Sequence, residues 1–100
     1  MILRQLLLAS VLLLPLAAQA HYPVMDCSRM GDEIACRIGF SDGTLAHGSE
    51  VVMYSYGEEV IHRVRADNSS TARFPWHDGE FFIQFDAGHE DPAEFDHVEF

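Results

Sequence analysis

Residues 27–36, CSRMGDEIAC, carry both cysteines of the chain at the ends of one short stretch. Gly31 and Asp32 at its centre suit a two-residue β-turn, because glycine accepts a positive φ at the first central position. Counting outward from this turn pairs Cys27 with Cys36 across an antiparallel hairpin. They fall in a non-hydrogen-bonded pair, in which Cα atoms lie about 4.5 Å apart, a separation that a disulfide tolerates. The stretch therefore predicts a disulfide-bonded hairpin, with a metal bound by the two thiolates as the alternative.

The same register divides the hairpin into two faces with different chemistry. The polar side chains of Asp26, Ser28 and Arg37 fall on one face. Turn chemistry, cysteine pairing and hydrophobic alternation agree, and this agreement is stronger than any one signal. The other face, expected to be buried, collects Met25, Cys27, Ile34, Cys36, Ile38 and Phe40.

The rest of the chain after residue 20 consists of short runs rich in Val, Ile, Tyr and Phe, separated by turn residues. This pattern is typical of an all-β sandwich and shows no helical periodicity. We expect a single seven-stranded antiparallel β-sandwich, transthyretin-like or immunoglobulin-like, with Trp76 and the phenylalanines between its sheets. The strands are expected at 24–29, 33–40, 50–56, 59–65, 71–75, 80–86 and 94–100.

The first twenty residues have the pattern of a secretory signal peptide. Arg4 precedes an uncharged apolar run over 6–18, and Ala-Gln-Ala at 18–20 suits signal peptidase. The apolar run of about thirteen residues is too short to span a bilayer, so a retained membrane anchor is the weaker alternative. The sequence thus predicts a signal peptide at 1–20 and one β-sandwich metal-binding domain at 21–100, with no direct membrane insertion after cleavage.

The composition narrows the class of function. Arg4 is the only charged side chain of the first twenty residues, so its removal takes the formal charge from −10 to about −11. Such a charge repels nucleic acid and anionic lipid and suits a protein that meets cations or basic partners, although solubility alone also explains it. No phosphate-binding loop, activated serine or redox CxxC motif is present, so an enzyme is not expected. A cysteine pair in a small exported domain indicates an oxidising compartment, and we expect the periplasm.

The histidines are the unusual feature of the predicted mature chain. Cleavage before His21 would create a terminal α-amine beside an imidazole, and the two can chelate one metal ion. Such groups titrate at about 7.7–8.0 and about 6.5, so both lose protons to a metal near neutral pH. A second imidazole, from His89 or His97, would complete a nitrogen-rich set that favours Cu(II) or Ni(II), with Asp86 or Glu90 as an oxygen ligand. The alternative for these residues is an ordinary acidic, solvated surface.

Two longer stretches carry a resemblance to a known family: GFSDGTLAHGSEVVMYSY at 39–56 and VRADNSSTARFPWHDGEFFIQFDAGHE at 64–90. Their order of features resembles the small transthyretin-like sandwiches related to carboxypeptidase regulatory domains. It is most similar to the periplasmic accessory component of bacterial nickel and cobalt uptake transporters of the energy-coupling type. The resemblance implies that His21 and His89 are metal ligands. It provides no counterpart for His97, and the disulfide hairpin does not follow from it.

We therefore expect a periplasmic protein that binds nickel or cobalt through His21 and assists membrane metal-uptake transporter components. A copper-binding chaperone with a histidine brace is the close alternative, because ligand chemistry alone favours copper. A second alternative is a β-sandwich interaction module without a metal, pairing through an edge strand. The predicted metal ligands are His21, His89, His97 and Asp86, and the predicted disulfide joins Cys27 and Cys36.

Overall fold

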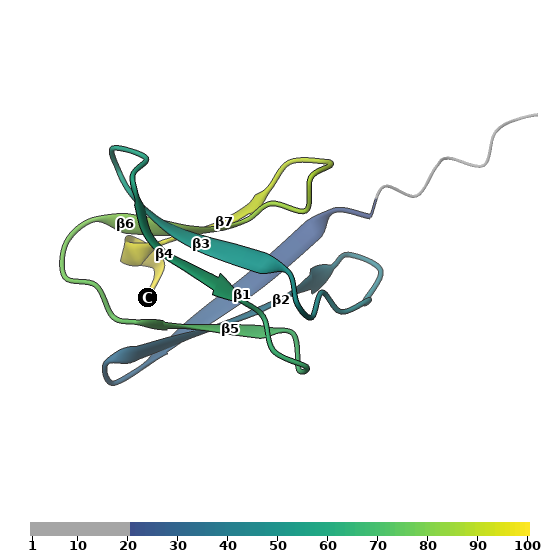
Figure 1. Ribbon diagram of the computed structural model, residues 1–100, viewed down its shortest axis with the longest axis horizontal. Helices are drawn as coiled ribbons and strands as arrows, with labels where there is room; N and C mark the ends of the chain where they lie inside the picture. Colours follow the sequence, from purple (N-terminus) through teal and green to yellow (C-terminus); the bar gives the residue numbers. More distant parts are fainter. Residues whose placement is uncertain (1–20) are drawn as a thin grey trace, which may run out of the picture.

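The computed structural model describes residues 21–100, and the predicted signal peptide lies outside the described residues. Within residues 21–100, seven strands form two antiparallel sheets that pack face to face (Figure 1). One sheet has the strand order β1-β2-β5 and the other β4-β3-β6-β7, which confirms the all-β prediction. The elements are β1 Pro23–Met30, β2 Glu33–Phe40, β3 Glu50–Ser55, β4 Val60–Arg65, β5 Thr71–Pro75, β6 Phe81–Phe85, β7 Ala93–Asp96 and the 3₁₀ turn η1 His97–Glu99.

The predicted hairpin is present with the predicted register. β1 pairs with β2 so that Cys27 lies opposite Cys36, and the two form a disulfide with Cα atoms 4.0 Å apart. Gly31 in the turn has a φ of +61°, as the turn requires. Both cysteines are buried in the core, and β5 pairs with the free side of β2, placing Ala72 opposite Cys36.

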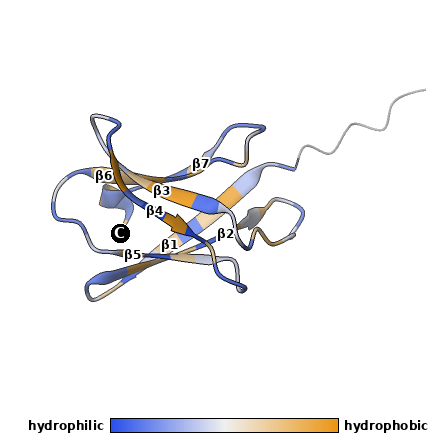
Figure 2. Cartoon of the chain, in the orientation of Figure 1, coloured by the Kyte–Doolittle hydropathy of each residue, from blue (hydrophilic) through white to orange (hydrophobic). Residues whose placement is uncertain are grey.

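The core lies between the sheets and draws on both of them. Hydrophobic residues concentrate on the strands, while the connecting loops are mostly hydrophilic (Figure 2). β1 contacts β7 and β4 contacts β5 across the interface, which closes the two open sides of the sandwich. The side chains that are almost completely buried include Ile34, Phe74, Val51, Met53, Phe81, Ile83 and Phe85.

Three aromatic side chains, Trp76, Phe82 and Phe100, depart from the prediction that Trp76 and the phenylalanines fill the core, and Phe100 is 36% exposed. Trp76 is half-buried at the margin, edge-on to Phe81, with the Arg29 guanidinium 3.7 Å from the centre of its ring. Phe82 alternates to the outer face of its sheet, where it stacks on Tyr54 at 5.3 Å. Strand alternation explains Phe82, since its neighbours in β6 already point inward.

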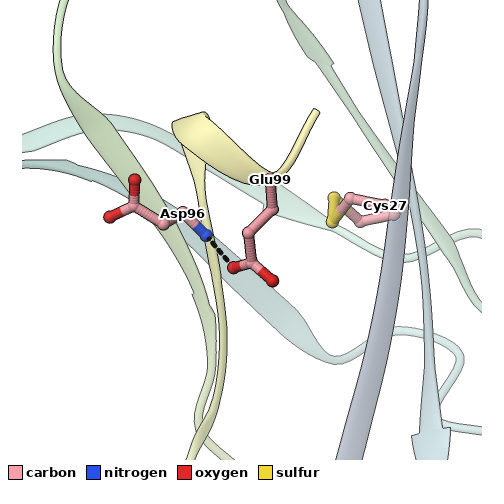
Figure 3. The surroundings of a disulfide bond; sticks show 4 residues. Cys27, Asp96 and Glu99 are labelled. Atoms are coloured by element: carbon pink, nitrogen blue, oxygen red, sulfur yellow. Dashed lines mark hydrogen bonds between the residues drawn. A yellow bond between two sulfur atoms is a disulfide. The ribbon is translucent and has the colours of Figure 1, made fainter.

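The last strand is shorter than expected. Instead of continuing over 94–100, β7 ends at Asp96 and the chain turns into η1. Asp96 accepts a hydrogen bond from the Val98 N–H, and Glu99 accepts one from the Asp96 N–H at 2.7 Å, which together form a capping box. Figure 3 shows the hydrogen bond from the Asp96 N–H to Glu99 in the surroundings of the disulfide. Among the described residues, no helix is long and apolar enough to cross a membrane.

The disulfide provides a direct test of the hairpin's contribution to stability. Replacing both cysteines, Cys27→Ala with Cys36→Ala, should lower the free energy of unfolding by about 2.5–3 kcal/mol. This is the chain-entropy value for a closed loop of about ten residues. Urea denaturation of the oxidised protein and of the double variant measures the difference. A loss below about 1 kcal/mol would mean that the turn and the strand register hold the hairpin without the cross-link.

Candidate metal-binding site

Three segments that are distant in sequence meet at one end of the sandwich. Pro23 at the start of β1 lies opposite Phe40 at the end of β2, and Phe85 at the end of β6 lies opposite Ala93. The rings of Phe40 and Phe85 meet edge to face at 5.8 Å and join the two sheets there. The residue before β1, the loop after β2 and the β6–β7 connection therefore emerge together, as Figure 1 shows.

A shallow pocket of about 240 Å³ lies at this end, and both leading histidines line it. His21 precedes β1 and is exposed, and His89 lies in the β6–β7 connection and is also exposed. The His89 imidazole stacks on the Phe40 ring, with centres 6.3 Å apart and planes inclined by 13°. Asp42 and Thr44 from the loop after β2 complete the lining. The structure thus brings His21 and His89 to one pocket.

Asp42 is the carboxylate of this pocket, in place of the predicted Asp86 or Glu90. Its Oδ1 accepts hydrogen bonds from the Thr44 N–H at 3.0 Å and the Thr44 hydroxyl at 2.6 Å. Its Oδ2 lies 3.5 Å from His21 Nδ1. The Thr44 hydrogen bonds, with a smaller effect of His21, hold the pKa of Asp42 below its ordinary value. The Asp-Gly-Thr turn directly after a strand was the available signal, because such turns fix a carboxylate near the strand end.

Asp86 lies outside this pocket. Its Oδ1 accepts a hydrogen bond from the Gly88 N–H at 2.8 Å. Its side chain lines a separate groove on the outer face of the four-stranded sheet, together with Tyr54 and Gln84. Strand alternation after Phe85 therefore places Asp86 on the outer face of this end, away from the pocket that His89 shares with His21.

His97 is carried to the opposite end of β7. The strand runs from Ala93, opposite Phe85, to Asp96, opposite Phe82, so the residue after it emerges beside the start of β6. His97 Nδ1 lies 3.1 Å from the Tyr56 hydroxyl and 3.3 Å from the Phe81 carbonyl oxygen. Figure 1 shows η1 and the C-terminus well away from the start of β1. The structure therefore does not place His97 with His21.

Tyr56, Asp96 and His97 form a compact polar cluster at that opposite end. The Tyr56 hydroxyl lies 2.8 and 2.9 Å from the two Asp96 carboxylate oxygens. This hydrogen bond, with the charge of the carboxylate, raises the pKa of Tyr56 to about 12. Desolvation acts to raise the pKa of Asp96, but hydrogen bonds from Tyr56 and Val98 outweigh it and lower that pKa. These hydrogen bonds connect the β3–β4 turn to the C-terminal turn.

The pocket contains donor groups of the types that bind transition metals, although these side chains are not arranged around a common point. Over residues 21–100, no group of three or more His, Cys, Asp or Glu side chains is arranged to hold a metal ion. Signal cleavage would add an α-amine at His21, a donor that side-chain groupings do not include. Two exposed imidazoles, that amine and the carboxylate of Asp42 fit a nitrogen-rich site with one oxygen ligand.

Fold and pocket together define a small, disulfide-bonded β-sandwich with two histidines and one carboxylate at one end. No known protein family, curated protein or solved structure matches the chain significantly. The function is therefore argued from the residues of the pocket.

The opposite cluster has a measurable signature. In a spectrophotometric pH titration, tyrosinate absorbance is measured for the unmodified protein and for Tyr56→Phe. The difference between the two should rise with a midpoint at about pH 12, the pKa of Tyr56. The raised pKa means that the neutral phenol is favoured by folding, so its stabilisation is complete below about pH 10 and is lost as the pH approaches 12. Tyr22→Phe, which removes an exposed tyrosine, is the control and should leave this high-pH step in place. A Tyr56 midpoint near 10 would contradict the Tyr56–Asp96 hydrogen bond.

Proposed function

We propose that the processed chain is a periplasmic protein that binds a divalent transition metal and assists nickel or cobalt uptake. The ligands are the α-amine and imidazole of His21 and the imidazole of His89, with Asp42 as the oxygen donor. One observation carries this proposal: His21 and His89, near opposite ends of the described chain, line the same pocket with Asp42.

The electrostatics of the pocket support a cation as its ligand. Asp42 lies against His21, and hydrogen bonds from Thr44 stabilise its ionised form. His21 and His89 are exposed, so their side chains can reorient around an ion without disturbing the core. The processed chain, with sixteen carboxylates and five arginines, also raises the concentration of cations near its surface.

The donor set and the family resemblance point to different metals. A nitrogen-rich set suits Cu(II) and Ni(II), and the divalent affinity order places copper above nickel and cobalt. The resemblance in the sequence favours nickel or cobalt and a membrane transporter as the partner. A copper chaperone is therefore the second candidate, and it is favoured by the same two imidazoles and amine.

The central test compares the protein that begins at a free His21 with a version whose His21 α-amine is acetylated. Titration with Ni(II), Co(II) and Cu(II), followed by calorimetry, should show at least tenfold weaker binding by the acetylated form. Acetylation turns the α-amine into an amide and supplies no new amine, so one donor is lost, and tenfold corresponds to about 1.4 kcal/mol. His47→Asn is the control for loss of an exposed histidine outside the pocket, and it should retain the affinity.

Two outcomes of this titration contradict different parts of the proposal. Equal binding by both forms would remove the amine from the site. Absence of binding by either form would remove the metal function and leave an interaction module as the surviving alternative. The order of the three affinities separates a nickel or cobalt protein from a copper protein.

A second test asks which carboxylate serves the site. Asp42→Asn keeps the Oδ1 that accepts from Thr44 but removes the charge beside His21, so metal affinity should fall several-fold. Asp86→Asn is the matched control, because it makes the same charge change outside the pocket, and its affinity should stay unchanged. Equal losses in the two variants would reduce the effect to the overall charge of the protein. Thermal unfolding of both variants verifies that each remains folded.

A further inference from the structure

The outer face of the four-stranded sheet carries a groove separate from the metal pocket. Two adjoining hollows of about 410 and about 160 Å³ share Tyr54 and Gln84 in their walls. One extends toward the start of β3 and the residues after β6, and the other extends toward the β3–β4 turn. Since β3 and β6 are paired neighbours, the groove follows this ladder along its length. Its lining includes Glu50, Val52, Tyr54, Glu58, Phe82 and Asp86.

The middle of the groove has an aromatic floor. Tyr54 and Phe82 are direct cross-strand partners, and their half-buried rings stack with centres 5.3 Å apart and planes inclined by 24°. Val52 beside them is only 6% exposed, although it lies on the outer face of the sheet. The floor is therefore well packed, and its aromatic faces can attract a cationic group.

Carboxylates surround this floor, and none of the described residues that line the groove is basic. Glu58 lies at the end beside the β3–β4 turn, and Asp86 lies at the other end. Glu50 is partly neutralised by Arg63, whose guanidinium lies 3.0 Å away. Asp86 uses its Oδ1 for the Gly88 N–H, which leaves Oδ2 for another donor. The groove thus offers negative charge at both ends and an aromatic surface between them.

We propose that this groove binds an extended, arginine- or lysine-bearing peptide segment of a partner protein. An extended peptide advances about 3.3 Å per residue, so side chains two residues apart match the spacing of alternate residues along β3. The stems of arginine and lysine pack on aromatic rings while their charged heads reach carboxylates at Glu58 and Asp86. Asp86 then serves peptide recognition, and the proposal stands independently of metal binding.

The test uses a fluorescein-labelled seven-residue peptide that alternates glycine with arginine, and the metal-free protein in EDTA. Anisotropy measures the affinity, and amide chemical shifts map the bound surface, where Tyr54, Phe82 and Gln84 should respond. The double variant Glu58→Gln with Asp86→Asn should bind at least fivefold more weakly. The matched control, Asp26→Asn with Asp78→Asn, makes the same charge change on exposed residues outside the groove and should bind as the unmodified protein does.

Several outcomes would overturn the proposal. Equal weakening by both double variants would show that only the total charge matters. Spermidine competing as effectively as the peptide would indicate diffuse cation attraction. A neutral oligosaccharide that shifts the same residues and binds the Glu58 and Asp86 variant equally well would assign the groove to a sugar. Chemical denaturation of the variants, all altered at exposed positions, verifies that folding is retained.

Discussion

The register of the β1–β2 hairpin determines where the candidate metal pocket lies. It is fixed from both directions, by the turn at Gly31 and by the Cys27–Cys36 disulfide within the strands. A slip by one residue would turn Ile34 and the cysteines from the core to solvent, so burial opposes it strongly. Because this register pairs Pro23 with Phe40, His21 and the loop carrying Asp42 emerge next to each other. The candidate metal pocket follows from the hairpin.

The loop that holds Asp42 is anchored to the core through the buried hydroxyl group of Ser70. Ser70 is fully buried, donates its hydroxyl hydrogen to the Ile38 carbonyl oxygen and accepts from the Ala46 N–H at 2.8 Å. Phe40 contributes a second fastening, since its N–H donates to the Thr44 carbonyl oxygen at 2.9 Å. A carboxylate on such a loop is held in place before any ligand arrives, which lowers the entropy that binding must overcome.

Much of the fold was predictable because local signals agreed with one another. The turn at Gly31, the cysteine spacing and the strand alternation each gave the hairpin, and the remaining strands were bounded by turn residues. The end of β7 was not predicted, although Asp96 and Glu99 have the spacing of a capping box. In the structure the capped turn forms there and the strand pairing ends. The carboxylate of the pocket was harder to predict from the sequence. Asp42 reaches His21 through the pairing of two strand ends, and hydrophobic periodicity alone contains no such information.

His89 and His97 lie at opposite ends of the four-stranded sheet because one precedes β7 and the other follows it. His89 and His97 were the two predicted sources of the second imidazole, and the chain reverses direction between β6 and β7. The returning strand, however, carries whatever follows it to the far end of the sheet. His97 places its Nδ1 3.0 Å from Asp96 and 3.1 Å from the Tyr56 hydroxyl, whereas the His89 ring stacks on Phe40 at the pocket that it shares with His21 and Asp42. A metal ligand must offer a free nitrogen lone pair, and breaking hydrogen bonds to free one costs binding energy. His89 is therefore the better candidate for the proposed metal site, and His97 contributes to holding the C-terminal turn.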